Sequence, residues 1–334
     1  MLLYLKKYFK HFVYKLFIIA FTSILTISTT INYTECKKDV ITNIDTDTDN
    51  SDSGHILNYS NLYNLKSLKE RFNLASGIQT YVNEKLGDTK DKYAIYYYDI
   101  NSGTSYTLNK DVRYYAASTA KVQIAMMIAD KINNSNLSIN DTISYDDKFY
   151  AEGAGSLQGS LTSGNPESID NLMKLMITES DNIACNMLNS IIDNRDDFYK
   201  KVFGHTIDIS DNKLSVDTQY NVLRYLYEKD NNKYYNSIIN YMKNTTTHDR
   251  LDRYIPTELV AHKIGDYENT VNDIGIIYTN HPYILCIFSN DDKIQRQYDN
   301  ISNISKKIYE LQTSSTVENI DNINKNINTD SDKN

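Results

Sequence analysis

Apolar residues recur at helical spacing near both ends of the folded part of the chain. Between Leu65 and Leu86 an apolar residue returns every three or four positions, which predicts an amphipathic helix. The residues expected on its buried side are Leu68, Phe72, Ala75, Ile78 and Val82. Near the other end, Lys293 to Leu311 is predicted to be a closing helix.

Two pairs of short apolar runs each enclose a turn segment. The turn segments are Asn101-Ser102-Gly103 and Asn280-His281-Pro282, so each pair predicts a β-hairpin. A further strand is predicted over Leu259 to Gly265. The flanking strands are expected at Tyr93–Ile100 with Thr104–Leu108 and at Asp273–Thr279 with Tyr283–Ser289.

The middle of the chain, from Ser118 to Tyr241, is predicted to be helical. Val122 to Ala129 is apolar almost all round, which is typical of a buried helix. Two more apolar runs, Leu172–Ile177 and Ile183–Leu188, are separated by a polar break. Strands and helices from the two chain ends therefore surround a helical middle.

The N-terminus has the pattern of an export signal. Lysines up to Lys15 precede the apolar run Leu16–Phe21, after which Ser and Thr dilute the apolar character. That dilution argues against a buried amphipathic helix, and Glu35 before Cys36 argues against a lipoprotein signal. We expect a secreted or membrane-anchored protein with an extracytoplasmic catalytic domain, and signal cleavage stays open.

Composition divides the chain into four parts. Residues 1–36 are expected to be a signal peptide or membrane anchor, and 37–60, rich in Asp, Thr, Asn and Ser, a disordered tether. The folded domain is predicted over 61–312, with a helical insertion at about 118–241. Residues 313–334 are expected to be a disordered tail.

Several function classes find no support in the composition. The net charge of −8 argues against a nucleic-acid surface, and no phosphate- or dinucleotide-binding glycine motif occurs. The six histidines are scattered and the three cysteines lack ligand spacing, so we expect no metal site and no cofactor. Cys185 and Cys286 lie in apolar runs and are predicted to be buried thiols, and His205 and His262 to be structural.

Ser118-Thr119-Ala120-Lys121 opens the apolar helix and indicates nucleophilic chemistry. A serine hydroxyl needs a base within hydrogen-bond reach, and a lysine one helical turn away lies on the same face. The N-terminus of a helix also offers backbone N–H groups that can hold an oxyanion. Taken alone, a serine at this position is more often an ordinary helix cap than a nucleophile.

Two later segments complete a pattern. Ser180-Asp181-Asn182 lies in the polar break, and His262-Lys263-Ile264-Gly265 lies in a predicted strand. In isolation the first segment indicates a helix break with capping groups and the second a solvated strand face. Ser210-Asp211-Asn212-Lys213 also fits both short motifs, but it lies in a polar stretch and is predicted to be a turn or cap.

The three segments in this order resemble the serine β-lactamase and penicillin-binding protein superfamily, with class A β-lactamases most similar. The resemblance spans roughly Leu65 to Leu311. It implies an α/β (α+β) fold: an antiparallel sheet covered by N- and C-terminal helices, with an inserted all-helical domain. It also implies a β-lactam or peptidoglycan-peptide substrate, and we expect a monomer that contacts a membrane only through its N-terminal segment.

The resemblance assigns roles by position in the motifs. Ser118 is the nucleophile, Lys121 its base and Ser180 a proton relay, while Asp181 is expected to bond local backbone. The residues expected to bind substrate are Asn182, Lys263, Gly265, Asp266 through its N–H, and Tyr150 at the rim.

Two departures from the superfamily pattern affect the expected activity, the first through substrate binding and the second through turnover. Ile264 stands where the superfamily has Thr, and Asp193 to Asp217 contains no glutamate to activate the deacylating water. Glu228 is expected to fall too late to serve, and Asp208 is the substitute base by position alone. We therefore expect slow deacylation. A D-alanyl-D-alanine peptidase and a non-catalytic wall- or partner-binding module remain alternatives.

Overall fold

The computed structural model describes residues 59–134, 137–209, 211–229 and 232–331, and side chains between 69 and 314 within those ranges. The chain divides into two units, Met1–Leu62 and Tyr63–Asn334, and nearly all described residues belong to the second. The expected signal segment, and the tether up to residue 58, lie outside the described residues. Across the described ranges, no helix combines the length and apolar character needed to cross a membrane.

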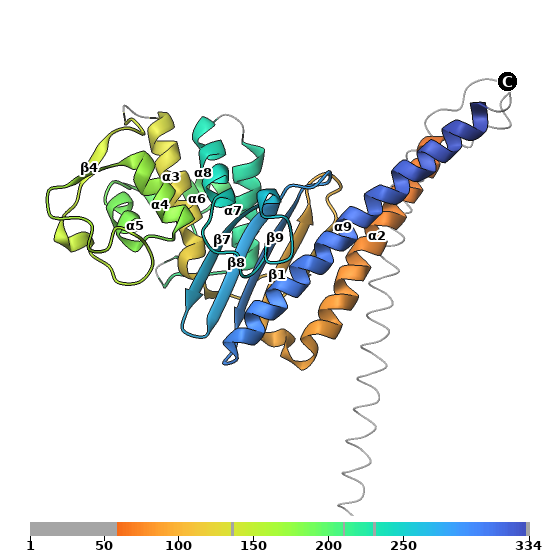
Figure 1. The fold of residues 1–334 in the computed structure, drawn as a ribbon, viewed down its shortest axis with the longest axis horizontal. Coiled ribbons are helices and arrows are strands. Elements are labelled where there is room, and N and C mark those ends of the chain that lie inside the picture. The colour runs from red at the N-terminus through yellow and green to blue at the C-terminus, as the bar shows by residue number, and fades with distance from the viewer. Residues whose placement is uncertain (1–58, 135–136, 210, 230–231, 332–334) are drawn as a thin grey trace, which may run out of the picture. The chain divides into compact units, whose positions relative to one another are not determined.

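A five-stranded antiparallel sheet forms the centre of the second unit (Figure 1). Its order is β2-β1-β9-β8-β7, so β7 is an edge strand. Both predicted hairpins are confirmed, since β1 pairs with β2 and β8 with β9. The strands are β1 (Tyr93–Asp99), β2 (Ser105–Leu108), β7 (Val260–Tyr267), β8 (Thr270–Ile277) and β9 (Tyr283–Asn290).

Helices cover both faces of this sheet. Alternate residues of a strand face opposite sides, so Ala94 packs with the helical middle while Ile95 packs toward the terminal helices. The terminal helices α2 (Tyr59–Leu86) and α9 (Ile294–Ser331) run side by side, with Gly77 close to Leu311 (Figure 1). The expected fold class, an antiparallel sheet between terminal helices and a helical insertion, is confirmed.

Both terminal helices differ in detail from the sequence expectation. The buried stripe of α2 consists of Leu74, Ile78, Val82 and Leu86, whereas Phe72 is 73% exposed. Ala75 is half-buried, and the side chain of Leu68 lies outside those described. The prediction for Phe72 was wrong because apolar residues of this helix fit two neighbouring stripes. Packing against the sheet decides which of the two stripes is buried. The closing helix continues past Leu311 to Ser331, so the segment expected to be disordered from Thr313 is helical as far as Ser331. No Gly or Pro interrupts it.

The inserted region is mainly helical but contains two short two-stranded sheets. One pairs β3 (Tyr114–Tyr115) with β6 (Lys213–Leu214), and the other pairs β4 (Thr142–Ser144) with β5 (Pro166–Ser168). Its helices are α3 (Lys121–Asn134), α4 (Ile169–Thr178), α5 (Asn182–Asn189), α6 (Arg195–Phe203), α7 (Val216–Glu228) and α8 (Lys233–Lys243). Four 3₁₀ turns complete the unit: η1 (Gly87–Lys92), η2 (Ala117–Ala120), η3 (Asp147–Phe149) and η4 (Thr257–Leu259).

Candidate active site

Ser118 lies in the 3₁₀ turn η2, which leads directly into α3. The sequence predicted an α-helix starting at this serine, and the structure begins the α-helix at Lys121 instead. Ala117 has a φ of +49°, a conformation that costs free energy for a residue with a side chain. Such a constraint immediately before Ser118 is typical of a functional turn.

Strands β7 and β8 hold η2 in place. The buried Asn272 of β8 donates a hydrogen bond to the carbonyl oxygen of Tyr115 at 2.8 Å. At Gly265 of β7, an added Cβ would lie 2.6 Å from the carbonyl oxygen of Ala116 and 3.0 Å from Thr119. The absence of a side chain at Gly265 therefore allows the turn carrying Ser118 to pack directly against the sheet edge.

A buried polar chain ties the same turn to three helices. Thr119 Oγ1 accepts a hydrogen bond from Gln219 of α7 at 2.9 Å, and Gln219 accepts one from Gln123 of α3 at 3.3 Å. Tyr199 of α6 donates to Gln123 at 2.7 Å. Each of these four side chains is at least 98% buried, so losing one partner would leave another unsatisfied.

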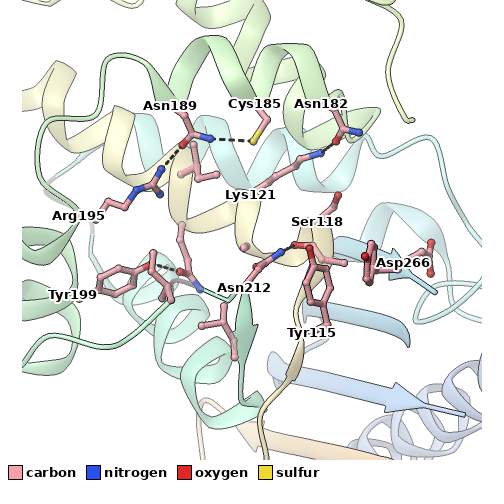
Figure 2. Close-up of a pocket in the computed structure, with 17 residues that line it drawn as sticks. Tyr115, Ser118, Lys121, Asn182, Cys185, Asn189, Arg195, Tyr199, Asn212 and Asp266 are labelled. Carbon is pink, nitrogen blue, oxygen red and sulfur yellow. Dashed lines mark hydrogen bonds between the residues drawn. The ribbon is translucent and has the colours of Figure 1, made fainter. Parts of the chain in front are cut away.

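Lys121 is 5% exposed and joins the first motif to the second. Its Nζ donates to the Ser180 carbonyl oxygen at 2.6 Å and to Ser180 Oγ at 3.4 Å. It also donates to Asn182 Oδ1 at 2.7 Å (Figure 2). Among the hydrogen bonds of the described residues, none joins Lys121 Nζ to Ser118 Oγ. Catalytic hydrogen bonds are often long until substrate is bound. Burial lowers the pKa of Lys121, which favours the neutral amine that a base must be.

The second motif, Ser180-Asp181-Asn182, is held by the loop that contains Gly155 and Leu157. Asp181 Oδ1 accepts the N–H of Ala184 at 2.8 Å and Oδ2 that of Leu157 at 2.9 Å, which confirms its expected backbone-bonding role. An added Cβ at Gly155 would lie 2.1 Å from Asp181 Oδ2, so this loop touches the motif directly. Ser180 has a φ of +60°, a second costly conformation at the site.

Asn182 and Tyr150 have different surroundings from those expected. Asn182 lines the cavity, but its amide also donates to the Glu152 carbonyl oxygen at 2.8 Å while its Oδ1 accepts from Lys121. Tyr150 is 54% exposed and is not among the residues described as lining the cavity. The loop after Tyr150 therefore contacts the site through its backbone.

On β7, Lys263 is 1% exposed and its Nζ donates to the Ile264 carbonyl oxygen at 3.3 Å. Burial, followed by the positive charge of Lys121, lowers the pKa of Lys263 to about 7. The side chain is not among those described as lining the cavity. Asp266 does line it, and its carboxylate accepts a 2.6 Å hydrogen bond from Arg250.

A cavity of about 630 Å³ opens beside Ser118 and Lys121 (Figure 2). Its far wall comes from the later part of α5, from α6 and from the turn around Asn212, none of which the sequence had placed at the site. Cys185 also lines it, so this cysteine is only partly buried, contrary to the expectation, while Cys286 is buried as expected. The wall residues missed by sequence reasoning include Tyr115, Asn189, Arg195, Tyr199, Asn212 and Tyr267.

The turn at Asn212, within the second segment that fits the short motifs, holds the turn of Ser118 in place through its backbone. Asn212 has a φ of +51° and its carbonyl oxygen accepts the N–H of Ala116 at 2.8 Å. The prediction of a turn at this segment is confirmed for its described residues. The asparagine itself was the signal in the sequence for this turn, because Asn adopts a positive φ more readily than most residues.

Neither candidate for a deacylating base points into this cavity. Asp208 lines a separate cavity together with Arg113 and is not among the described residues that line the Ser118 cavity, so the geometry gives no support to its selection by position. Glu228 ends α7 and pairs with Arg224 at 2.7 Å. Asp266 is the only carboxylate among the described residues that line the cavity beside Ser118.

Comparison with known proteins agrees with this geometry. Residues 73–312 match the β-lactamase enzyme family. The chain is 27% identical to β-lactamase VEB-1 of Pseudomonas aeruginosa over 214 residues, which cover 54% of this chain and 70% of that protein.

Solved structures share the fold. PBP-A superposes with a TM-score of 0.65 at 19% identity, covering 71% of this chain and 96% of that one. A PBP-A mutant in an acyl-enzyme complex with penicillin G gives a TM-score of 0.63 at 19% identity, covering 73% and 97%. The TLA-3 extended-spectrum β-lactamase gives 0.64 at 21% identity, covering 71% and 98%.

The family match spans most of the chain and includes the turn of Ser118, the polar break at Ser180 and the edge strand of Lys263. This chain therefore belongs to the β-lactamase enzyme family and is a serine hydrolase of that superfamily.

Proposed function

We propose that this chain is an exported hydrolase that forms an acyl-enzyme with β-lactams or related amides through Ser118. The observation that carries the proposal is that Ser118, Lys121 and Asn182 line one cavity, with Lys121 bonded to the Ser180 segment. Class A β-lactamases and a PBP-A acyl-enzyme with penicillin G share the fold, which supports the substrate class.

In the proposed reaction, Lys121 accepts the Ser118 hydroxyl proton as Oγ attacks the amide carbonyl carbon. The N–H groups of Ser118 and Asp266 stabilise the resulting oxyanion. The C–N bond then breaks, and the Ser180 hydroxyl passes a proton to the leaving nitrogen. Ser118 is left as an ester, and water must release the acyl group.

Substrate binding is proposed to use Asn182 for the substrate amide and Lys263 for its carboxylate. Gly265 admits the substrate backbone close to the edge of β7, since this strand has no neighbour on that side in the sheet. Lys263 is buried, so its attraction would act from beneath the cavity surface. Arg195 is the second cation to test, because it lines the cavity directly.

Deacylation is proposed to be slow. General-base assistance contributes roughly 10²- to 10⁴-fold to such a step, and Asp266, the described carboxylate in the cavity, is already engaged by Arg250. A long-lived ester would behave like that of a penicillin-binding protein. A D-alanyl-D-alanine peptidase, which would use the same acylation step, is therefore the second candidate.

The test is incubation of the purified chain with a fluorescent penicillin, followed by intact-mass analysis over time. We expect one covalent adduct that forms quickly, persists, and is lost in Ser118→Ala. Ser210→Ala is the matched control, because Ser210 also fits both short motifs. An adduct that survives Ser118→Ala, or no adduct with several penicillins, would favour the non-catalytic alternative.

Export is tested separately. Protease added to intact cells should remove the folded domain of an anchored form, while a cleaved form should appear in the medium. Full-length protein protected in the cytoplasm contradicts this part of the proposal.

A further inference from the structure

Two histidines from different segments of the chain, His248 and His262, lie beside one aspartate, Asp252. His248 and Asp252 lie on the segment between α8 and η4, and His262 lies on β7. One ligand atom from each residue can be chosen so that all three lie within 4.8 Å of one another. His248 Nδ1 contacts Asp252 Oδ2, and His262 Nε2 lies 3.3 Å from the same oxygen.

One buried polar atom of this cluster has no hydrogen-bond partner. Asp252 is 2% exposed, and its Oδ1 accepts no hydrogen bond. His262 is fully buried, and its Nε2 has only the ion-pair contact with Asp252 Oδ2 at 3.3 Å. A buried acceptor without a partner is costly, so a ligand that engages Asp252 Oδ1 would be favoured.

The outer contacts orient His262 as in a metal site. Its Nδ1 bonds to the Asp273 carboxylate of β8 at 2.9 Å, which leaves Nε2 directed at Asp252. A carboxylate on the far nitrogen is the usual partner of a metal-bound histidine. Asp273 is itself held, since its Oδ2 accepts the N–H of Leu251 at 3.1 Å.

The spacing of His262 and Asp252 suits a small tetrahedral cation, whereas His248 Nδ1, in direct contact with Asp252 Oδ2, has to move away from that oxygen to become the third ligand. Two ligand atoms about 2.0–2.1 Å from zinc at a tetrahedral angle lie about 3.4 Å apart, close to the 3.3 Å between His262 Nε2 and Asp252 Oδ2. The carboxylates of Asp252 and Asp273 balance a charge of two. The His248 side chain is 45% exposed, which gives an ion access from solvent and room for a water ligand.

We propose that His248, Asp252 and His262 bind a zinc ion, with Asp273 orienting His262. The site is separate from the Ser118 cavity, whose described lining includes none of these residues. It joins β7 to the segment before η4, one residue away from Lys263. The proposal does not depend on the acylation chemistry.

The experiment is calorimetric titration of the chelator-treated full chain with zinc. We expect about one high-affinity equivalent, and at least about a 10-fold weaker affinity in His248→Ala, since even outer contacts change metal affinity by that much. His248→Ala should fold, because the side chain is half exposed, and unchanged circular dichroism checks this. His281→Ala, an exposed histidine on the β8–β9 turn, is the matched control and should bind as the wild type does.

Cobalt gives a readout that needs no variant. Co²⁺ bound by the wild type should show the strong visible absorption of a four-coordinate site, and zinc should abolish it. A wild-type zinc Kd weaker than about 100 μM, equivalent to about 5.5 kcal/mol, would overturn the proposal. Equal zinc affinity in wild type and His248→Ala would overturn it too, because the metal would then lie elsewhere in the chain.

Discussion

Lys121 is the residue whose environment most directly controls the proposed chemistry. It is buried by its neighbours, and this burial lowers its pKa from the ordinary lysine value. A lowered pKa means that the neutral amine appears at lower pH than for a free lysine. The base form required by Ser118 is therefore populated closer to neutrality.

The first prediction concerns the pH dependence of acylation. The penicillin acylation rate should rise with pH through the lowered pKa of Lys121 and level off above it. Lys121→Ala should be slower by about 10²- to 10⁴-fold and lose this pH dependence. The rate is measured by stopped-flow labelling, with the exposed Lys174→Ala as control. A wild-type rate that falls with rising pH would exclude Lys121 as the base.

The second prediction concerns release of the acyl group. Asp208→Asn and Glu228→Gln should leave the lifetime of the penicillin adduct unchanged, because neither side chain is among the described residues that line the Ser118 cavity. The lifetime is followed by loss of adduct mass after removal of free penicillin. Rapid release that collapses in either variant would show that the base had been misplaced.

At the scale of elements, the site depends on how closely η2 approaches β7. Gly265 sets that distance, because any Cβ there would meet the Ala116 carbonyl oxygen at 2.6 Å. A backbone carbonyl cannot rotate out of the way as a flexible side chain can. The turn carrying Ser118 would have to move.

The third prediction follows from this contact. Gly265→Ala should slow acylation by about 10²-fold or more, since a displacement near 1 Å can have that effect. Gly77→Ala is the control, because its Cβ would meet only the flexible side chain of Leu311 at 3.3 Å. Normal labelling of Gly265→Ala would mean that β7 and η2 are more loosely packed than described.

The fourth prediction distinguishes the two faces of α2. Ile78→Ala should lower the free energy of unfolding by about 2–5 kcal/mol, because Ile78 is 1% exposed between the sheet and α9. Phe72→Ala should change it by no more than about 0.5 kcal/mol, because Phe72 is exposed. Urea denaturation measures both. Similar losses in the two variants would mean that Phe72 is covered by another part of the chain or by a partner.

At the scale of the whole molecule, the domain boundaries remain a proposal. The sheet, the helical insertion and both sets of covering helices lie within the second unit, and the family match spans 73–312. The proposed folded domain, 61–312, contains the Ser118 cavity completely.

The fifth prediction is that a fragment of residues 61–312 folds alone and is labelled by penicillin at the rate of the full chain. Its circular dichroism and cooperative melting test folding, and intact mass tests labelling. The helical segment beyond residue 312 lies outside the family match, so its loss should leave the cavity unchanged. A fragment that melts without cooperativity would show that the tail belongs to the folded domain.

Much of the fold followed from local sequence patterns. The strands around Asn101-Ser102-Gly103 and Asn280-His281-Pro282 were predictable because alternation and turn residues act over a few positions. The nucleophile and its base could also be predicted from local sequence, since a spacing of three residues places Ser118 and Lys121 one helical turn apart. The order of the three motifs then indicated the superfamily, and the family match confirmed it.

Other features required tertiary structure because they depend on residues distant in sequence. Which stripe of α2 is buried was decided by the sheet, which covers Ile78 and leaves Phe72 exposed. The cavity wall at Arg195 and the meeting of His248 with His262 arise from chain crossings that no local period encodes. Local patterns therefore determined the elements and the reactive pair, whereas packing alone decided what surrounds that pair, because side-chain contacts between distant segments are set by the whole fold.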